Sequence, residues 1–325
     1  MEATKSKIVV HDVPPYLRVY HDGTVERLLG TGFAPASLDP STSVSSKDIL
    51  LHPETSLSAR LYLPTPSPST KLPLVLYFHG GAFCISSSAD PLYHSMLNSL
   101  ARRAQALLVS VDYRLAPEHP LPAAYHDSWS ALLSLSSSPD PWIAQHADFD
   151  RVFLAGDSAG ANIAHHLAIR VGDLNVLIPG QYLSAGREVG FGIRGALMVQ
   201  PYFWGEEAMG PERENPVFKA VVDGWWRFVC PSEKGCDDPM INPFVDGAPG
   251  MEGSGCGRVL VCVAGNDILR ERGKLYYKVL SESKWEGKAE LFETEGEDHV
   301  FHIIDPTSQN SRDLLQRCAD FINQG

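Results

Sequence analysis

The stretch Val152-Phe153-Leu154-Ala155-Gly156-Asp157-Ser158-Ala159-Gly160 decides how this chain folds. Residues 152–155 form an apolar run typical of a strand buried on both faces, and residues 159–171 repeat apolar positions at helical spacing. Between these two elements, the glycines on either side of Ser158 allow a sharp turn, which holds the serine in a strained conformation with its oxygen projecting from the sheet edge. We therefore interpret Ser158 as a nucleophile, the alternative being a flexible serine turn without chemistry.

Other apolar runs of strand length lie before and after this stretch, with helical patterns between them. A chain that alternates buried strands and helices builds a mostly parallel sheet covered by helices on both faces. We therefore predict an α/β fold with the serine turn at the end of a central strand. The other predicted strands are 74–78, 107–111, 196–199, 259–263 and 289–293, and the clearest further helix is 123–135.

A serine hydroxyl needs a neighbouring base to accept its proton, and histidine suits this role because its pKa lies near neutrality. His299 has the best context of the twelve histidines, since it lies in a polar loop between the strand 289–293 and the last helix. His302, three residues further on, is its rival. His165 and His166 lie on the helix after Ser158, point away from the end of the sheet and are interpreted as ordinary helix residues, and His11 and His52 have no supporting context.

The base in turn needs a carboxylate that fixes its tautomer and stabilises the imidazolium. The chain order serine, acid, histidine places this acid between residues 158 and 299. Asp267 fits best, because it directly follows the strand 259–263, and catalytic loops cluster at the carboxyl ends of such strands. Asp298 is adjacent to His299 and is poorly placed to meet its ring. The other candidate acids lie in the irregular stretch 203–249 and fit less well: Asp237, Asp238 and Asp246.

Acyl transfer also needs N–H groups that bind the oxyanion of the tetrahedral intermediate. A glycine turn after the strand 74–78 supplies candidates at Gly80, Gly81 and Ala82, and the N–H of Ala159 would complete the set. The alternative is a glycine turn with a purely structural purpose. The order of the two motifs along the chain favours an oxyanion hole.

Composition limits the classes of partner. The chain has 27 Lys and Arg residues against 39 Asp and Glu residues, so it lacks the basic excess that nucleic-acid binding needs. We expect no nucleic-acid partner, and no window is apolar and long enough for a membrane span. The six cysteines show no C-x-x-C spacing and no Asn-x-Ser/Thr sequon occurs, so we expect a reducing, cytoplasmic compartment, with Cys262 and Cys318 as buried fillers.

The length of 325 residues is about twice that of a usual domain. No linker separates the parts that carry the motifs, so we predict one α/β domain over residues 1–325. Residues 203–249, rich in Gly, Pro, Trp and acidic residues, interrupt the strand and helix rhythm and are interpreted as an insertion over the sheet. Residues 17–28 predict a hairpin around Asp22-Gly23. The sequence gives no indication of oligomeric state.

At these residues the chain resembles the α/β-hydrolase fold, and more narrowly the plant carboxylesterase branch of the hormone-sensitive-lipase-like group. The resemblance covers nearly the whole chain. The segments that carry it are His79-Gly80-Gly81-Ala82-Phe83, Asp112-Tyr113-Arg114-Leu115-Ala116-Pro117-Glu118, Gly156-Asp157-Ser158-Ala159-Gly160, Asp298-His299-Val300-Phe301, and the N-terminal residues 15–20 and 22–27.

The resemblance implies that residues before about 45, with part of 203–249, form a cap above the active site. It also implies that Asp267 and His299 act with Ser158. One departure is Ala82, where the wider lipase-like group has glycine. Because the oxyanion hole uses backbone N–H groups, alanine at this position need not disable it.

The expected function is that of a serine carboxylesterase, which needs neither a metal nor an organic cofactor and acts on a small-molecule ester. The resemblance leaves open a dehydratase or cyclase of specialised plant metabolism, or a small-molecule hormone receptor, on the same fold. The complete set of Ser158, Asp267 and His299 favours hydrolysis. Five aromatic residues of the expected cap either favour an apolar or aromatic substrate group or simply pack the cap onto the body: Phe203, Trp204, Trp225, Trp226 and Phe244.

Overall fold

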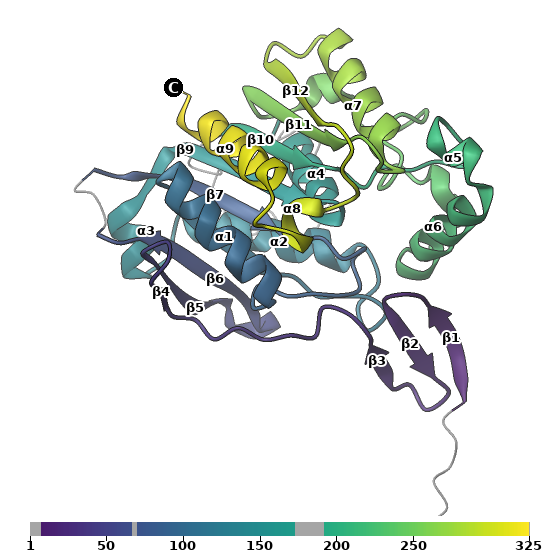
Figure 1. Ribbon diagram of the computed structural model, residues 1–325, viewed down its shortest axis with the longest axis horizontal. Coiled ribbons are helices and arrows are strands. Elements are labelled where there is room, and N and C mark those ends of the chain that lie inside the picture. The colour runs from purple at the N-terminus through teal and green to yellow at the C-terminus, as the bar shows by residue number, and fades with distance from the viewer. Residues whose placement is uncertain (1–7, 67–69, 173–191, 325) are drawn as a thin grey trace, which may run out of the picture.

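The computed structural model describes residues 8–66, 70–172 and 192–324 (Figure 1). In these ranges a nine-stranded sheet forms the centre of the molecule, and a three-stranded sheet is built from the N-terminal residues. The small sheet contains β1 (Val9–Val13), β2 (Leu17–Tyr20) and β3 (Val25–Arg27). The large sheet contains β4 (Leu38–Asp39), β5 (Val44–His52), β6 (Leu57–Pro64), β7 (Leu72–Phe78), β8 (Leu107–Asp112), β9 (Ala147–Asp157), β10 (Ile193–Val199), β11 (Arg258–Ala264) and β12 (Lys288–Thr294).

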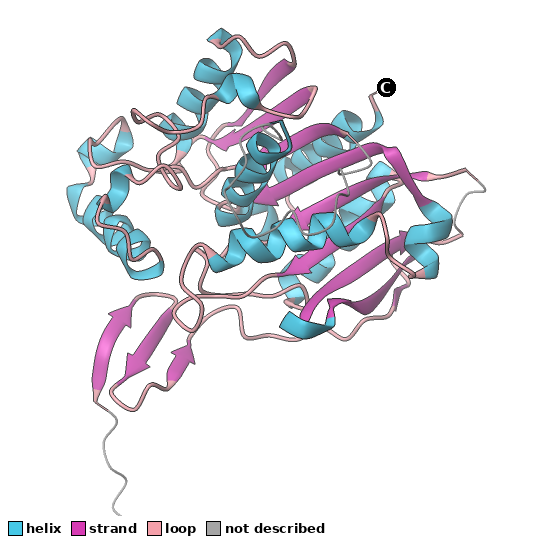
Figure 2. Cartoon of the chain, turned by 180° about the vertical axis from the view of Figure 1, so that it is seen from behind, coloured by secondary structure: helices cyan, strands magenta, loops and turns pink. Residues whose placement is uncertain are grey.

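Helices cover both faces of the large sheet, as Figures 1 and 2 show from opposite sides. The helices are α1 (Pro91–Ala104), α2 (Ala123–Leu135), α3 (Pro141–His146), α4 (Ala159–Gly172), α5 (Pro211–Glu214), α6 (Pro216–Val229), α7 (Arg270–Glu282), α8 (Phe301–Ile304) and α9 (Gln309–Asn323). None of these helices is long and apolar enough to cross a membrane.

The order of strands in the large sheet is β12-β11-β10-β9-β7-β8-β6-β5-β4. Strands β7 to β12 pair in parallel, whereas β4, β5 and β6 pair antiparallel at one side. This arrangement confirms the predicted mostly parallel sheet. The carboxyl ends of β7, β9, β11 and β12 therefore meet at one edge, where the loops that follow them can share a site.

The central strand β7 shows how the two cores form. All seven of its residues are buried. Leu74, Leu76 and Phe78 belong to the core cluster shared with α2, α4 and α7, whereas Val75 and Tyr77 belong to the cluster shared with α1 and α9. Alternate side chains of a strand point to opposite faces, so a continuous apolar run is what a strand between two helical layers requires.

The N-terminal part of the chain differs from the expectation of a cap that extends to about residue 45. The strands β4 and β5 pair within the large sheet, so residues 38–45 belong to the body of the molecule. The three-stranded sheet before them lies beside α6, where the Tyr16 and Trp225 ring centroids are 4.8 Å apart. The Trp225 indole N–H also donates to the carbonyl oxygen of Pro14 at 3.0 Å.

Arg27, the last residue of β3, fixes this small sheet to the body. Its Nε donates to the carbonyl oxygen of Cys84 at 2.8 Å, and its Nη2 donates to that of Ala116 at 3.1 Å. The guanidinium also makes two hydrogen bonds with the Glu118 carboxylate, at 2.8 and 2.7 Å. Arg27 therefore connects the N-terminal sheet to two segments of the body, one that follows the glycine turn after β7 and one that follows β8.

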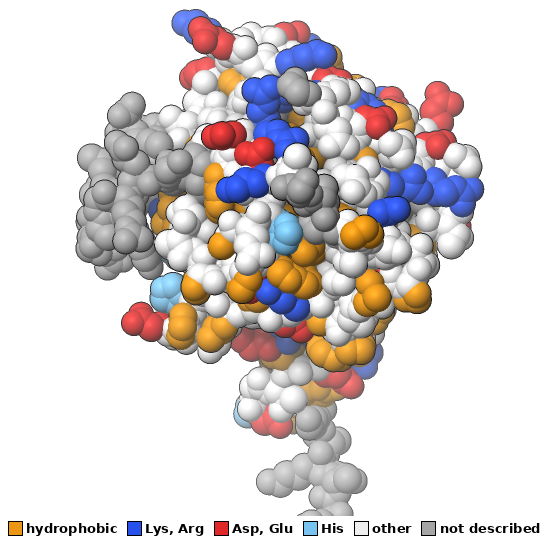
Figure 3. All heavy atoms as spheres, turned by 90° about the vertical axis from the view of Figure 1, so that its left-hand side faces the viewer, with side chains coloured by type: hydrophobic (Ala, Val, Ile, Leu, Met, Phe, Trp, Pro, Cys, Tyr) orange, Lys and Arg blue, Asp and Glu red, His pale blue; other side chains and the backbone are white. Residues whose placement is uncertain are grey.

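The surface seen in Figure 3 mixes apolar, basic and acidic side chains, with Lys and Arg scattered among Asp and Glu. All six cysteines are buried free thiols, including Cys262 and Cys318 as predicted. A mixed surface of this kind over a buried apolar interior is typical of a globular domain.

Candidate active site

Ser158 lies at the turn between β9 and α4, as the glycine pattern predicts. Its φ of +50° is in the left-handed region, and its N–H donates to the carbonyl oxygen of Val199 at 2.9 Å. A Cβ at Gly160 would lie 1.8 Å from the Phe78 carbonyl oxygen, so only glycine allows α4 to approach the end of β7 this closely. Close packing of the two chain segments thus holds the serine in its strained conformation.

The structure brings the three predicted side chains together. His299 Nε2 lies 3.0 Å from Ser158 Oγ, and His299 Nδ1 lies 2.7 Å from Asp267 Oδ2. The loops after β11 and β12 are joined by backbone bonds, in which the Asn266 N–H donates to the Glu297 carbonyl oxygen at 2.9 Å. Asp267 and His299 face each other because their two strands are parallel neighbours.

The electrostatics of this group suit proton transfer. Burial lowers the pKa of His299, but the Asp267 carboxylate beside it raises the pKa more, so the net pKa lies above its usual value of 6.5. Asp267 is itself buried, and its Oδ1 accepts the N–H of Leu269 at 2.9 Å. With Oδ1 held in this way, Oδ2 is oriented toward the imidazole.

The glycine turn after β7 lies beside the serine, but the structure contradicts one of its predicted donors. The N–H of Gly80 already donates to the Tyr93 hydroxyl at 2.8 Å and to Asp157 Oδ1 at 3.1 Å. Gly80 is therefore not an oxyanion donor, because its hydrogen points into the protein. The sequence did not indicate this, since neither acceptor is near Gly80 along the chain.

The other three predicted donors remain available. In the described ranges, the N–H groups of Gly81, Ala82 and Ala159 have no hydrogen-bond acceptor within the protein. Gly81 and Ala82 have φ values of +105° and +49°. Ala82 thus adopts the left-handed conformation although it has a side chain, and it lines the same cavity as Ser158.

His302, the rival base, does not line the cavity that contains Ser158 and His299. Its ring is buried in a small apolar cavity between the sheet and helices α1 and α9, and neither ring nitrogen has a hydrogen-bond partner among the residues that the structure describes. Burial lowers the pKa of His302 to about 3, with the nearby His299 adding to the effect. Of the helical pair, His165 Nδ1 meets the Tyr276 hydroxyl at 3.1 Å, and His166 Nε2 donates to the Met240 carbonyl oxygen at 2.9 Å.

Ser158 and His299 open into a cavity of about 440 Å³. One of its walls is aromatic, because Trp225 packs against Tyr16 and meets the Phe218 ring nearly perpendicularly at 5.8 Å. Together the lining residues present an apolar wall and a few polar groups, as is usual for small-molecule sites. The full lining is Tyr16, Ala82, Ser158, Tyr202, Pro211, Asn215, Phe218, Val222, Trp225, Asn266, Asp267, Ile268, Leu269, Asp298 and His299.

Of the five aromatic residues that the sequence suggested for this wall, only Trp225 lines the cavity. Phe203, Trp204 and Trp226 are fully buried, and Phe244 packs against Phe203 with centroids 6.1 Å apart. Tyr16 and Phe218 were not predicted as wall residues. Phe218, Val222 and Trp225 follow the i, i+4, i+7 spacing of one helix face, and this signal could have identified the α6 part of the wall.

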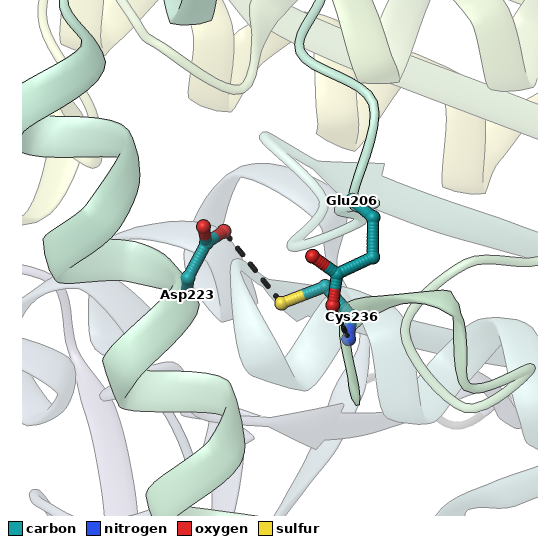
Figure 4. Close-up of side chains that lie close together, drawn as sticks. All are labelled: Glu206, Asp223 and Cys236. Carbon is teal, nitrogen blue, oxygen red and sulfur yellow. Dashed lines mark hydrogen bonds between the residues drawn. The ribbon is translucent and has the colours of Figure 1, made fainter. Parts of the chain in front are cut away.

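A second cluster, in which Glu206, Asp223 and Cys236 bring their ligand atoms within 4.8 Å of one another, does not fit a metal (Figure 4). Lys219 Nζ donates to Asp223 Oδ1 at 2.8 Å, and Arg227 Nη2 donates to Glu206 Oε1 at 2.8 Å. Burial raises the pKa of the Cys236 thiol to about 12, so it is protonated at neutral pH. A metal would have to displace both cations, and we interpret the cluster as an ion-pair network within the insertion.

A mostly parallel sheet covered on both faces, with a hydrogen-bonded serine, histidine and aspartate at the carboxyl ends of its strands, defines the class of α/β hydrolases. The family model described as "alpha/beta hydrolase fold" matches residues 75–303. The chain belongs to this family and, within it, to the plant carboxylesterases.

Two plant relatives are similar over nearly their full length. Probable carboxylesterase 2 of Arabidopsis thaliana is 51% identical, covering 100% of this chain and 99% of the relative. The 2-hydroxyisoflavanone dehydratase of Glycyrrhiza echinata is 45% identical, covering 98% of both chains. Among solved structures, an esterase of Pyrobaculum calidifontis superposes with a TM-score of 0.68 at 27% identity, covering 85% of this chain and 84% of that one.

Proposed function

We propose that this protein is a serine carboxylesterase that hydrolyses an ester of a small apolar or aromatic molecule. The observation that carries the proposal is the hydrogen-bonded series from Ser158 through His299 to Asp267, open to the cavity of about 440 Å³. The 51% identity with a relative named probable carboxylesterase 2 supports the same activity.

In the first half of the reaction, Ser158 Oγ attacks the ester carbonyl carbon. His299 Nε2, 3.0 Å from Oγ, accepts the hydroxyl proton as the new C–O bond forms. Asp267 holds the opposite ring nitrogen and stabilises the imidazolium. The protonated His299 then gives its proton to the leaving alcohol oxygen, and an acyl group remains on Ser158.

The negative charge that develops on the carbonyl oxygen is bound by the N–H groups of Gly81, Ala82 and Ala159. Each preorganised donor of this kind contributes about 3 kcal/mol to transition-state stabilisation. The N-terminus of α4 lies behind Ser158 and also favours negative charge at this point. In the second half of the reaction, His299 activates a water molecule that releases the acid and frees Ser158.

The walls of the cavity support the substrate class. Trp225, Tyr16 and Phe218 offer aromatic faces, and Ile268 and Leu269 add apolar surface beyond the Asp267 loop. An aromatic contact contributes about 0.5–1.5 kcal/mol beyond the buried area, or roughly a 2- to 12-fold change in affinity. An ester with a flat apolar group therefore suits this site better than an acetate does.

Replacing Trp225 tests the substrate assignment. Trp225→Leu is expected to raise the KM of a p-nitrophenyl ester with an aromatic acyl group about 5-fold and to leave that of p-nitrophenyl acetate within about 2-fold. Trp142→Leu, on α3 and outside the cavity, is the matched control. Equal effects of Trp225→Leu on both esters would count against an aromatic subsite.

The second candidate is a dehydratase or cyclase that uses His299 as a base without acyl transfer. It is favoured by the 45% identity with a relative named 2-hydroxyisoflavanone dehydratase. The two functions differ in their dependence on the nucleophile, since Ser158→Ala removes acyl transfer but leaves the base in place.

The experiment that separates them compares the parent protein with Ser158→Ala on p-nitrophenyl esters and on hydroxylated flavonoid compounds. The carboxylesterase proposal expects ester turnover by the parent and its loss, by about 10³-fold or more, in the variant. Undiminished ester turnover in a folded Ser158→Ala variant would refute it. Elimination of water by the parent at a rate above ester hydrolysis would favour the dehydratase.

We also propose that residues 1–325 form one domain in which the N-terminal sheet and the insertion 203–249 cap the cavity. The contact between Tyr16 and Trp225, which both line the cavity, supports this division. Deleting residues 1–28 is expected to raise KM, while the remaining body still unfolds cooperatively. Loss of all cooperative unfolding in that variant would argue that the N-terminal sheet is part of the core.

For location we propose the cytoplasm, which six buried free thiols support. Relatives from Tulipa gesneriana and Arabidopsis thaliana are named as chloroplastic and mitochondrial, so the family is not confined to one compartment. A fluorescent fusion of the full chain in leaf cells is expected to give a diffuse cytoplasmic signal. A signal that coincides with plastids or mitochondria would contradict the assignment.

A further inference from the structure

Asp157 is a fully buried acid next to the nucleophile, and the reaction steps described for Ser158, His299 and Asp267 do not use it. Its Oδ1 accepts the Tyr77 hydroxyl at 2.8 Å and the Gly80 N–H at 3.1 Å, and its Oδ2 accepts the Tyr93 hydroxyl at 2.8 Å. The side chain of Asp157 therefore points away from the cavity and toward the base of the glycine turn, while its backbone leads directly into Ser158.

The contact between Asp157 and the glycine turn is close. A Cβ built on Gly80 would lie 2.4 Å from Asp157 Oδ2 and 3.0 Å from the Tyr93 hydroxyl, so no other residue fits there. The Gly80 N–H is shared between the Tyr93 hydroxyl and Asp157 Oδ1. These two acceptors come from different parts of the fold, α1 for Tyr93 and the end of β9 for Asp157.

The hydrogen bonds that hold the Gly80 N–H lie at the start of the segment that carries the proposed oxyanion donors. Gly81 and Ala82, which carry two of the proposed oxyanion donors, follow Gly80 directly and have φ values of +105° and +49°. Phe83 continues the left-handed run at +62°. Because residues with side chains disfavour this region, the run needs fixed contacts at its start, and a rotation at Gly80 would redirect both N–H groups.

The charge of Asp157 also reaches His299. The titratable groups that face the carboxylate are Tyr77 from β7, Tyr93 from α1, Tyr113 after β8, and His299 after β12. Burial raises the pKa of Asp157 to about 6, so the group is ionised at neutral pH. Its negative charge joins that of Asp267 in raising the pKa of His299, which favours the imidazolium.

We propose that Asp157 is a positioning residue of the esterase reaction, which holds Gly80 so that the N–H groups of Gly81 and Ala82 point at the oxyanion. This inference rests on the proposed function. A purely structural role would require Asp157 only for stability, whereas a positioning role requires it for the transition state more than for the bound ester. The two roles can be separated by measuring kcat, KM and transition-state-analogue affinity.

Asp157→Asn is the variant of choice, because the amide keeps the shape but loses the charge and cannot accept a hydrogen bond through its nitrogen. We expect kcat for p-nitrophenyl butyrate to fall at least about 10-fold, with KM within about 2-fold of the parent. A misplacement of reacting groups by about 1 Å lowers rates by roughly 100-fold, which sets the scale for displaced oxyanion donors. The Ki of a butyl trifluoromethyl ketone, whose hemiketal oxyanion occupies the same hole, should rise by the same factor as kcat/KM falls. The acid limb of the kcat/KM profile should move to lower pH.

A matched control and a milder variant guard against simple misfolding. Asp238→Asn alters another buried aspartate, which accepts the Met240 N–H at 2.8 Å and makes no hydrogen bond to the glycine turn, and it should leave Ki unchanged. Tyr93→Phe removes one acceptor of the Gly80 N–H and leaves the Asp157 carboxylate in place, so kcat should fall about 3- to 10-fold. If Asp157→Asn does not fold, the loss of analogue affinity in Tyr93→Phe decides the question.

The inference is overturned if folded Asp157→Asn has a kcat/KM and a Ki within about 2-fold of the parent. If Asp157→Asn is unfolded, the inference is overturned when Tyr93→Phe has a kcat/KM and a Ki within about 2-fold of the parent. The parent and Ser158→Ala are measured alongside. Absence of ester turnover by the parent would count against the proposed function itself, whereas turnover by the parent with an unaltered Asp157→Asn would count against the positioning role alone.

Discussion

Asp267 Oδ2 lies 2.7 Å from His299 Nδ1, although the two residues are 32 positions apart in the sequence. The parallel pairing of β11 with β12 places both at the same edge of the sheet, and Asp267 Oδ1 is held by the Leu269 N–H. The carboxylate is thus fixed before a substrate arrives. Because the carboxylate accepts the proton of His299 Nδ1, Nε2 of the neutral ring is unprotonated and faces Ser158 Oγ.

Replacing Asp267 by asparagine tests this relationship. The amide preserves the shape but favours the wrong tautomer of His299, so Asp267→Asn should lower kcat about 10⁴-fold, while KM is expected to stay within about 3-fold because the amide has nearly the size of the carboxylate. Steady-state kinetics on a p-nitrophenyl ester measure both constants. A loss below about 10-fold in a protein with the parent's melting temperature would exclude Asp267 as the orienting acid.

The pH dependence of kcat/KM follows from the raised pKa of His299. The base accepts a proton only when neutral, so activity falls as the pH falls through its pKa, which lies above 6.5. We expect the acid limb of the profile, measured with an uncharged ester, to have its midpoint above pH 6.5. In Asp267→Asn the midpoint should shift to lower pH, because the neighbouring negative charge is gone. A parent midpoint well below 6.5 would contradict the assignment.

His302 makes a prediction about stability. Its pKa falls from 6.5 to about 3 on folding, so below pH 6.5 the unfolded chain binds a proton that the folded chain excludes. Stability from this group is therefore complete above pH 6.5 and is lost progressively as the pH falls toward 3. At about pH 5 the loss amounts to about 2 kcal/mol.

His302→Leu should remove this loss, because leucine suits a cavity lined by Leu100, Leu314 and Leu315 and does not titrate. Urea unfolding at about pH 7.5 and about pH 5 measures the difference, and the parent should lose about 2 kcal/mol more than the variant between the two pH values. His21→Gln, at an exposed turn, serves as the control. Equal losses in the parent and His302→Leu would show that His302 is solvated.

The fold, and the three side chains that the structure brings together at the end of the sheet, were predictable from the sequence because each signal is local. Apolar runs such as 74–78 and 259–263 can be assigned to strands without knowing their neighbours. Parallel strands then bring their carboxyl ends to one edge, which made Ser158, Asp267 and His299 candidates for a shared site. The chemistry of each residue type narrowed the choice to serine, histidine and acid, whereas His299 and His302 are separated by their surroundings, since His302 is buried on α8.

What the sequence did not predict depends on contacts between distant segments. The Gly80 N–H is taken by Tyr93 and Asp157, which are 13 and 77 positions away. Residues 38–45 join the large sheet because β5 pairs with β6, a choice that their own composition does not indicate. Trp226 is buried while its neighbour Trp225 lines the cavity, and composition alone does not distinguish two adjacent tryptophans of α6.

The most direct test of Ser158 as the nucleophile is the mass of the protein, and of its peptides, after reaction with diisopropyl fluorophosphate. Fluoride leaves as the Ser158 oxygen bonds to phosphorus, with His299 accepting the hydroxyl proton. We predict a single adduct per chain on the peptide that contains Ser158, with complete loss of ester hydrolysis, and no adduct in Ser158→Ala. An adduct on another residue, or hydrolysis that survives complete labelling of Ser158, would show that Ser158 is not the nucleophile.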